Sequence, residues 1–262
     1  MGKSILYLGD TTLKEAGSYL AGVMSHHNIS FDYLPSDQQF GDTLLNNKYQ
    51  AVIISDYPAK NFSTEQINTI AEQVAAGLGL LMIGGWESFA GGQYTGTKLS
   101  QVLPVIMQSA DDRVNCFAPC LVEKVKEHEI LGTLPFEESP PSINGFNRLK
   151  SKPNSSTILL ARRFKASYLP PRLASRDAEA GVNGNFTIAA LEDPDPLLVV
   201  SSYKQGRVCA FATDAAPHWV GGLVDWGNSR VEAQGPGARP IEVGNWYAAL
   251  LANMINWTAG RL

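Results

Sequence analysis

The sequence predicts an α/β protein built on a parallel sheet. Three short apolar segments, 5–8, 51–55 and 80–83, are bounded by turn residues, as is typical of strands covered on both faces. Segments with helical spacing of apolar residues separate them, and repeated strand–helix–strand units indicate parallel strands joined by right-handed crossovers. We therefore expect the ligand site of this protein at the carboxyl ends of the strands.

The composition is that of an ordinary globular protein and argues against several classes of partner. The chain has 262 residues, of which 44% are hydrophobic and 18% charged, and its net charge is -4. This acidic balance, without a Lys/Arg run, argues against nucleic-acid binding. There is no apolar run of about 18 residues, so no membrane span or membrane partner is expected. The apolar stretch after Met1 is too short for a signal peptide. We expect a cytoplasmic protein without a cofactor.

The first half of the chain alternates strands and helices. After strand 5–8 we expect an amphipathic helix, a strand at 29–34, a short helix at 42–46 and strand 51–55. The apolar stripe of the first helix comprises Leu13, Ala16, Leu20, Val23 and Met24.

The helix that precedes strand 80–83 has explicit end signals. Ser63 fits the N-cap position, and Gln66, three residues later, completes a capping box. Gly77 is placed to end the helix in a left-handed conformation.

From about residue 111 to residue 195 the chain is richer in Pro, Ser and Asn. The best strand candidates in this region are 143–149, 157–161 and 186–191, and residues 170–171 and 175–185 are typical of a long exposed loop. We expect this region to be a β-rich insertion or extension packed on the sheet, within a single domain that spans residues 1–262.

The last part of the chain predicts a hairpin and a long helix. Strands 197–201 and 208–212 are joined by a tight turn that Gln205-Gly206 supplies. The final helix, from about 243 to 258, places four large apolar residues on one face: Trp246, Leu250, Met254 and Trp257.

Several polar residues follow directly after predicted strands. They are Asp10, Asp56, Trp86-Glu87-Ser88, Asp214 and His218. If the strands are parallel, these side chains converge on one edge of the sheet. A purely structural interpretation is available for each. Asp10 and Asp56 can be N-caps of the next helices, and His218 beside Trp219 can be a packed histidine.

The glycine-rich stretch after strand 80–83 is neither a dinucleotide fingerprint nor a P-loop. Gly84-Gly85 and Gly91-Gly92 have the wrong spacing, and Lys98 follows too late. We expect these glycines to offer backbone N–H groups to an anion or a carbonyl group.

No residue stands out as a nucleophile. Cys209 falls in the middle of a strand, where a thiol is buried and inert. Cys116 and Cys120 do not have the spacing of a zinc site. Ser88 is not flanked by the glycines of a Gly-x-Ser-x-Gly elbow.

Taken together, motifs over nearly the whole chain resemble those of the class I glutamine amidotransferase-like proteins of an uncharacterised bacterial subgroup. The motifs are Gly84-Gly85-Trp86-Glu87-Ser88-Phe89, Gly91-Gly92-Gln93-Tyr94, His128-Glu129-Ile130-Leu131, Asn144-Gly145-Phe146-Asn147-Arg148, Phe211-Ala212-Thr213-Asp214, Pro217-His218-Trp219 and Asn253-Met254-Ile255-Asn256-Trp257. The resemblance implies a flavodoxin-like three-layer α/β/α sandwich.

The resemblance also implies where a glutaminase would keep its nucleophile. An active class I amidotransferase has a Cys in the elbow after the strand that corresponds to 80–83, and a distant His-x-Glu pair. Here the elbow is Gly84-Gly85-Trp86-Glu87, and His218 is followed by Trp219 and Val220 instead of a glutamate. Without a thiolate there is no acyl-enzyme route to ammonia. We therefore expect no glutamine hydrolysis.

Three functions remain open. The first is binding of a small polar or anionic ligand, with Glu87 and His218 as the candidate catalytic residues and no metal assigned. Its ligand-binding residues would be Gly84, Gly85, Trp86, Glu87, Ser88, Gly91, Asp214 and His218. The second is a metal-dependent hydrolase that uses Asp10, Asp56, Glu87, Asp214 and His218. The third is an interaction or scaffolding module that forms a homo-oligomer through the 111–195 region and the Trp-rich C-terminal segment.

Overall fold

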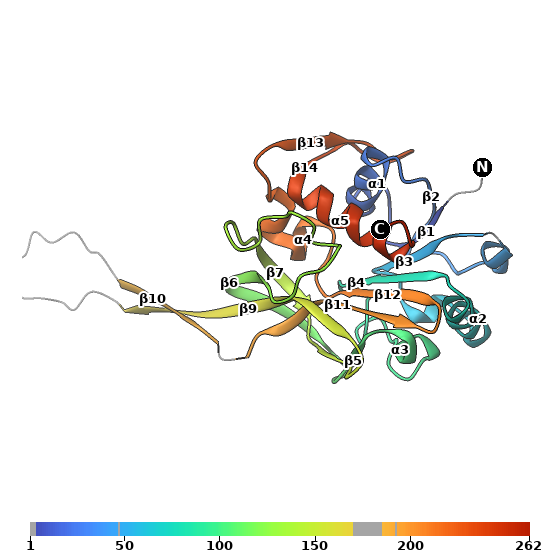
Figure 1. Cartoon of the computed structure of the whole chain (residues 1–262), viewed down its shortest axis with the longest axis horizontal. Helices are drawn as coiled ribbons and strands as arrows, with labels where there is room; N and C mark the ends of the chain where they lie inside the picture. Colours follow the sequence, from blue (N-terminus) through green and yellow to red (C-terminus); the bar gives the residue numbers. More distant parts are fainter. Residues whose placement is uncertain (1–3, 47, 170–184, 192) are drawn as a thin grey trace, which may run out of the picture.

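One mixed sheet runs through the part of the chain that the structure describes. The computed structural model describes residues 4–46, 48–169, 185–191 and 193–262. Within these residues the sheet has ten strands in the order β2-β1-β3-β4-β12-β11-β9-β6-β7, and β10 pairs with β9 (Figure 1). The strands are β1 (Ile5–Gly9), β2 (Phe31–Leu34), β3 (Ala51–Ser55), β4 (Gly79–Ile83), β6 (Arg113–Lys124), β7 (Ser142–Asn147), β9 (Ser156–Leu169), β10 (Asn185–Ala190), β11 (Asp195–Tyr203) and β12 (Gly206–Phe211).

The first five strands in this order are parallel, as the sequence predicts. β1 pairs in parallel with β2 and β3, and β4 pairs in parallel with β3 and β12. Every residue of β1, β3 and β4 is buried, which explains why these segments are apolar throughout. The predicted strands 5–8, 51–55 and 80–83 are confirmed.

The 111–195 region extends the sheet instead of packing on it. β9 pairs antiparallel with β11 on one edge and with β6 on the other, and β6 pairs with β7. The region is thus an extension of the sheet itself. Added strands satisfy the backbone groups that β11 would otherwise leave unpaired at an edge.

The strand boundaries in this region also differ from those predicted. Segment 143–149 divides into β7 and β8 (Leu149–Ser151), and β8 pairs with β5 (Val105–Met107) in a small separate sheet. Strand 157–161 is the start of the much longer β9. β6 was not predicted, because its alternation of polar and apolar residues is broken at Phe117 and the segment contains Pro119. Most of the predicted loop, residues 170–184, lies outside the described residues.

Helices lie on both sides of the parallel strands. Figure 1 shows α1 and α5 on one side and α2 and α3 on the other, and α5 packs against β3, β4 and β12. The α-helices are α1 (Gly17–His26), α2 (Thr64–Ala75), α3 (Lys98–Val102), α4 (Pro217–Val220) and α5 (Asn245–Thr258). Short 3-10 helices are η1 (Asp42–Asn46), η2 (Ala59–Asn61) and η3 (Gly221–Asp225). A two-stranded sheet of β13 (Arg230–Ala233) and β14 (Ile241–Gly244) completes the fold.

Several element ends and one turn differ from the sequence prediction. α1 begins at Gly17, so Leu13 and Ala16 precede it in a turn. α5 begins at Asn245, because Val243 belongs to β14. In the β11–β12 hairpin Tyr203 pairs with Gly206, so the turn residues are Lys204 and Gln205, with Lys204 at a φ of 52°.

No helix of the described residues is both long enough and apolar enough to cross a membrane.

The capping box of α2 gives a test of the sequence-level prediction. The Gln66 N–H donates to Ser63 Oγ, and the Ser63 N–H donates to Gln66 Oε1 at 2.8 Å. Ser63→Ala should lower the free energy of unfolding by about 1 kcal/mol, because one N–H group at the helix start loses its acceptor. Urea unfolding would measure the loss. Asn68→Ala, at an exposed position in the same helix, is the control and should be neutral or slightly stabilising.

Candidate functional site at the strand ends

Three aspartates meet at the carboxyl ends of the parallel strands. Asp10 follows β1, Asp56 follows β3, and Asp214 lies shortly after β12. One carboxylate oxygen from each lies within 4.8 Å of the others. We call Asp10, Asp56 and Asp214 the carboxylate cluster. The parallel strand order produces this convergence, since the strands all end at one edge of the sheet.

Asp10 and Asp56 are not helix N-caps. The N-cap of α1 is Ala16, which makes no side-chain cap, and the N-cap of α2 is Ser63. Both aspartates have left-handed backbones, with φ angles of 46° and 48°. This conformation is tolerated by Asp, and it turns the chain sharply at the strand end. The N-cap interpretation of these residues was therefore wrong.

Each carboxyl group of the cluster is fixed by hydrogen bonds. The Tyr7 hydroxyl donates to Asp10, and the Glu87 N–H donates to Asp56 Oδ1 at 2.8 Å. The N–H groups of Ala215 and Ala216 donate to Asp214 Oδ1 at 2.6 and 3.0 Å. The side chains are thus oriented by one tyrosine hydroxyl and by three backbone N–H groups.

Gly85 is required for the approach of Asp56 to the loop after β4. A Cβ atom at this position would lie 2.2 Å from Asp56 Oδ1, and the φ angle of Gly85 is 151°. Any side chain here would displace Asp56 from the cluster.

Burial raises the pKa of all three aspartates. The pKa of Asp10 rises to about 6, and that of Asp56 rises to about 7, where the negative charge of Asp10 adds to the effect of burial. The pKa of Asp214 is raised well above its ordinary value by burial and then by the charges of Asp56 and Asp10. Asp10 and Asp214 are buried and Asp56 is partly exposed. Three carboxyl groups this close together do not all ionise near neutral pH, so the cluster holds protons and titrates as a unit.

The glycine-rich loop after β4 is tied down by hydrogen bonds that the sequence did not predict. The Gly85 N–H donates to Asn147 Oδ1 at 3.0 Å, and Asn147 Nδ2 donates to Asp112 Oδ1 at 2.9 Å. Asp112 also accepts the N–H groups of Ala90 and Gly91 at 3.0 and 3.4 Å. Asn147 falls in one of the motifs that carry the family resemblance, but nothing in the sequence marked Asp112.

These hydrogen bonds leave the glycine N–H groups with partners. Gly84 donates to the carbonyl oxygen of Phe211 at 2.7 Å, and Gly85 and Gly91 donate to Asn147 and Asp112. In this conformation none of the three is free to bind an anion. Ser88 has a structural part, because its Oγ donates to the Ile83 carbonyl at 2.6 Å and accepts the Asp56 N–H at 3.0 Å.

The side chains of Trp86, His218 and Trp219 lie beside the carboxylate cluster, and we call them the aromatic rim. Trp86 is 43% exposed, and the guanidinium carbon of Arg113 lies 4.9 Å from the centroid of its ring. The rings of His218 and Trp219 lie 6.0 and 6.2 Å from the Trp86 ring. His218 is exposed, whereas Trp219 is buried and donates from Nε1 to Asn115 Oδ1 at 2.8 Å.

Glu87 and His218, the two candidate catalytic residues, are not part of the carboxylate cluster. Among the described residues, the group whose ligand atoms lie within 4.8 Å of one another contains only the three aspartates. The Glu87 side chain is 47% exposed and pairs with Lys60 at 3.7 Å. Its charge nevertheless raises the pKa of Asp56, so Glu87 borders the site.

The raised pKa values predict a pH dependence of stability. A folded-state pKa near 6 to 7, against about 3.9 in the unfolded chain, means that the folded cluster holds extra protons in this range. The stabilisation that these protons give the folded state is complete at pH values below the unfolded-state pKa. It is lost as the pH rises through 6 and 7. Asp56→Asn keeps the acceptor for the Glu87 N–H, so at about pH 7.5 it should be more stable than the wild type by about 1–2 kcal/mol.

Urea unfolding at about pH 5 and pH 7.5, in EDTA, would measure this difference, which should shrink at the lower pH. Asp225→Asn is the control, since this exposed residue pairs with Arg230 on the surface and should change stability little at either pH. Equal stability of Asp56→Asn and the wild type at both pH values would contradict the prediction.

Comparisons with known proteins identify the family. The family model described as "Putative glutamine amidotransferase" (GATase1_like) matches residues 3–169. Among curated proteins no match to the sequence was found. A solved structure of a cytoplasmic protein from Salmonella typhimurium LT2 is 30% identical, covers 82% of this chain and 90% of its own, and has a TM-score of 0.61.

Two further solved structures share the fold. A second cytoplasmic protein, from Salmonella typhimurium, is 24% identical over 97% of this chain and 98% of its own, with a TM-score of 0.69. A protein from Thermoplasma acidophilum described as a putative GMP synthase subunit is 9% identical over 99% of this chain and 96% of its own, with a TM-score of 0.51. Since the family model covers more than half of the sequence, this chain belongs to the glutamine amidotransferase-like (GATase1_like) family.

Proposed function

We propose that this protein does not hydrolyse glutamine and that it binds a small polar ligand at the carboxylate cluster, beside the rim of Trp86 and His218. The observation that carries the proposal is the convergence of Asp10, Asp56 and Asp214, whose oxygens lie within 4.8 Å of one another. Desolvating and orienting carboxyl groups at the ends of parallel strands costs folding free energy, and groups of this kind are typical of ligand sites.

The residues after β4 support the absence of glutaminase activity. The loop there is Gly84-Gly85-Trp86-Glu87, and the three cysteines of the chain lie elsewhere, on β6 and β12. Cys209 is fully buried in β12, and burial raises the pKa of its thiol. No thiolate is therefore placed to attack a glutamine amide. We also propose the flavodoxin-like three-layer sandwich of class I amidotransferases, which the helices on both sides of β1, β3 and β4 support.

The charge of the cluster favours a ligand with hydrogen-bond donors or a positive charge. A negative ligand beside partly ionised carboxylates would be repelled, and the glycine N–H groups that could offset this repulsion already donate within the protein. We therefore propose an amine, amide or polyol as the ligand class, in preference to an anion.

A divalent cation is the second candidate, because the cluster consists of three carboxylates. Calcium binds carboxylate oxygens at about 2.3–2.6 Å, so ligands on opposite sides of the ion lie roughly 5 Å apart. The separations within 4.8 Å in the cluster fit this size. A bound cation could activate water for hydrolysis, with Glu87 at the border of the site as a base.

We propose a cytoplasmic location, which both Salmonella typhimurium proteins have in their descriptions. Self-association of the chain stays a prediction, and light scattering after size-exclusion chromatography would test it.

Incubation with glutamine tests the first part of the proposal. Ammonia release by the purified protein should equal the background without protein, because the chain has no elbow thiolate. A coupled assay with glutamate dehydrogenase would detect the ammonia. Turnover that grows with protein concentration would contradict the absence of glutaminase activity.

A thermal-shift screen tests the ligand. Small amines, amides and polyols, and separately calcium and manganese, should be titrated against the wild type, Asp56→Asn and Asp225→Asn. A cluster ligand raises the melting temperature of the wild type and of Asp225→Asn, and not of Asp56→Asn, because binding to the folded state alone is stabilising. Stabilisation by metal alone favours the second candidate. A shift that persists in Asp56→Asn would place the ligand elsewhere and contradict both candidates.

A further inference from the structure

Two cysteines, Cys116 and Cys120, lie at the two ends of a bulge in β6. The register between β6 and β7 passes from Asn115↔Gly145 to Cys120↔Ile143, so β6 uses five residues where β7 uses two. The backbone of residues 116–119 therefore leaves the ladder, as in a β-bulge. The Cys116 and Cys120 side chains, at the two ends of the bulge, interact closely enough for each thiol to shift the pKa of the other.

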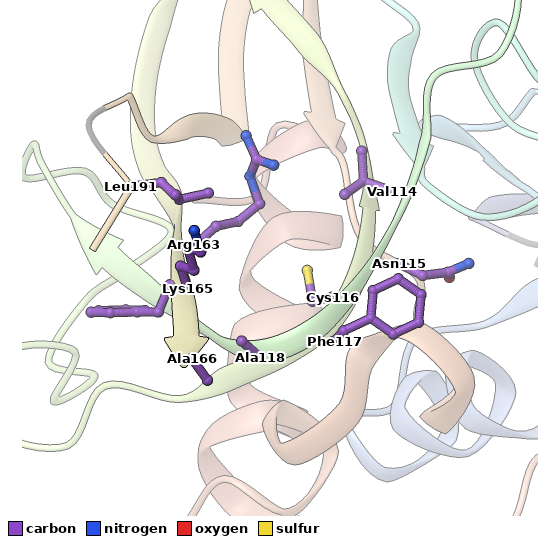
Figure 2. A pocket seen from close by; sticks show the side chains of 10 residues that line it. Val114, Asn115, Cys116, Phe117, Ala118, Arg163, Lys165, Ala166 and Leu191 are labelled. Atoms are coloured by element: carbon purple, nitrogen blue, oxygen red, sulfur yellow. The ribbon is translucent and has the colours of Figure 1, made fainter. Parts of the chain in front are cut away.

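Cys116 opens into a cavity. A cavity of about 400 Å³ lies between β6 and β9, with Val114, Phe117, Phe164 and Leu191 among its lining residues. Figure 2 shows the Cys116 sulfur pointing into the space between the two strands, with Arg163 and Leu191 opposite. Cys116 is partly exposed, and Cys120 is fully buried behind it. The volume is large enough for a small organic molecule.

The charges around the pair distinguish the two thiols. The interaction with the Cys120 thiol lowers the pKa of Cys116 against the opposing effect of burial, and the Arg163 and Arg148 guanidinium groups lower it further. Asp195 pairs with these arginines at 3.0 and 3.4 Å and partly offsets them. The same interaction, with burial, raises the pKa of Cys120. Cys116 thus has the thiolate character, and Cys120 supplies the proton.

We propose that Cys116 is an oxidisable thiol, that Cys120 is its resolving partner, and that a hydroperoxide entering the cavity between β6 and β9 converts the pair into an intramolecular disulfide. A partly exposed thiol in a cationic setting, beside a second thiol and open to a cavity, has the features of a redox-sensitive site.

The reaction balances in two steps. The Cys116 thiolate attacks one peroxide oxygen, an S–O bond forms, the O–O bond breaks, and an alcohol leaves after taking a proton. Cys116 is then a sulfenic acid, and the peroxide has been reduced by two electrons. The Cys120 sulfur attacks the Cys116 sulfur, the S–S bond forms, and hydroxide leaves and takes the Cys120 proton as water. Loss of the Cys116 negative charge removes the interaction that raised the pKa of Cys120.

Cys209 provides an internal reference. It is fully buried in β12, where burial raises the pKa of its thiol. The described residues that line the cavity do not include it. Its thiol should remain unmodified under conditions that oxidise Cys116.

The test is treatment of the full chain with cumene hydroperoxide, followed by mass spectrometry of the intact protein and its peptides. The wild type and Cys209→Ser should lose the mass of two hydrogen atoms and yield a peptide linked between Cys116 and Cys120. Cys120→Ser should instead accumulate a sulfenic acid on Cys116 that dimedone traps. Cys116→Ser should form neither product. Iodoacetamide should label Cys116 at least about tenfold faster than Cys209 in the untreated protein.

Two results would overturn the proposal. One is labelling of Cys116 no faster than that of Cys209. The other is oxidation of the wild type without a link between Cys116 and Cys120, which would exclude Cys120 as the resolving partner. Circular dichroism of each variant verifies its fold, and since Cys209→Ser keeps the pair intact, the proposal can be tested even if Cys120→Ser does not fold.

Discussion

The structure depends on the convergence of three carboxyl groups, two of them buried and one partly exposed, at the carboxyl ends of the parallel strands. Asp10, Asp56 and Asp214 repel one another when ionised, and burial removes the water that would solvate them. The surrounding chain compensates through the Tyr7 hydroxyl and the N–H groups of Glu87, Ala215 and Ala216. The left-handed backbones of Asp10 and Asp56 and the glycine at position 85 make the close approach of these groups possible.

Strand β6, one of the strands that the 111–195 region adds to the sheet, borders the aromatic rim. Arg113, Asn115 and Cys116 are near neighbours on β6. Arg113 lies against Trp86, Asn115 accepts the Trp219 N–H, and Cys116 faces the cavity. A single irregular strand therefore borders both the aromatic rim and the thiol pair.

Local signals predicted the parallel strands β1, β3 and β4 well. The apolar segments of β1, β3 and β4 and the capping box at Ser63 involve residues close in sequence, and the parallel order follows from them. The convergence of Asp10, Asp56 and Asp214 followed from that order. The choice of Glu87 and His218 as reactive residues did not follow from the strand order, because the direction of a side chain depends on long-range packing.

The features that sequence reasoning missed are long-range. Asn147 and Asp112 hold the glycine loop from positions far along the chain, and β6 alternates too irregularly to be recognised as a strand. The Cys116–Cys120 pair depends on a bulge that only the pairing of β6 with β7 defines. The sequence spacing of these cysteines argued against a zinc site and gave no reason to consider them as a pair.

The protonation of the carboxylate cluster tests the central claim most directly. Carbon-13 NMR of carboxyl-labelled aspartate, assigned with Asp10→Asn, Asp56→Asn and Asp214→Asn, would follow each group through a pH titration. The account predicts that all three titrate well above the ordinary aspartate value of about 3.9, and that each substitution lowers the apparent pKa values of the other two. Titration of all three near the ordinary value, unaffected by the substitutions, would contradict it.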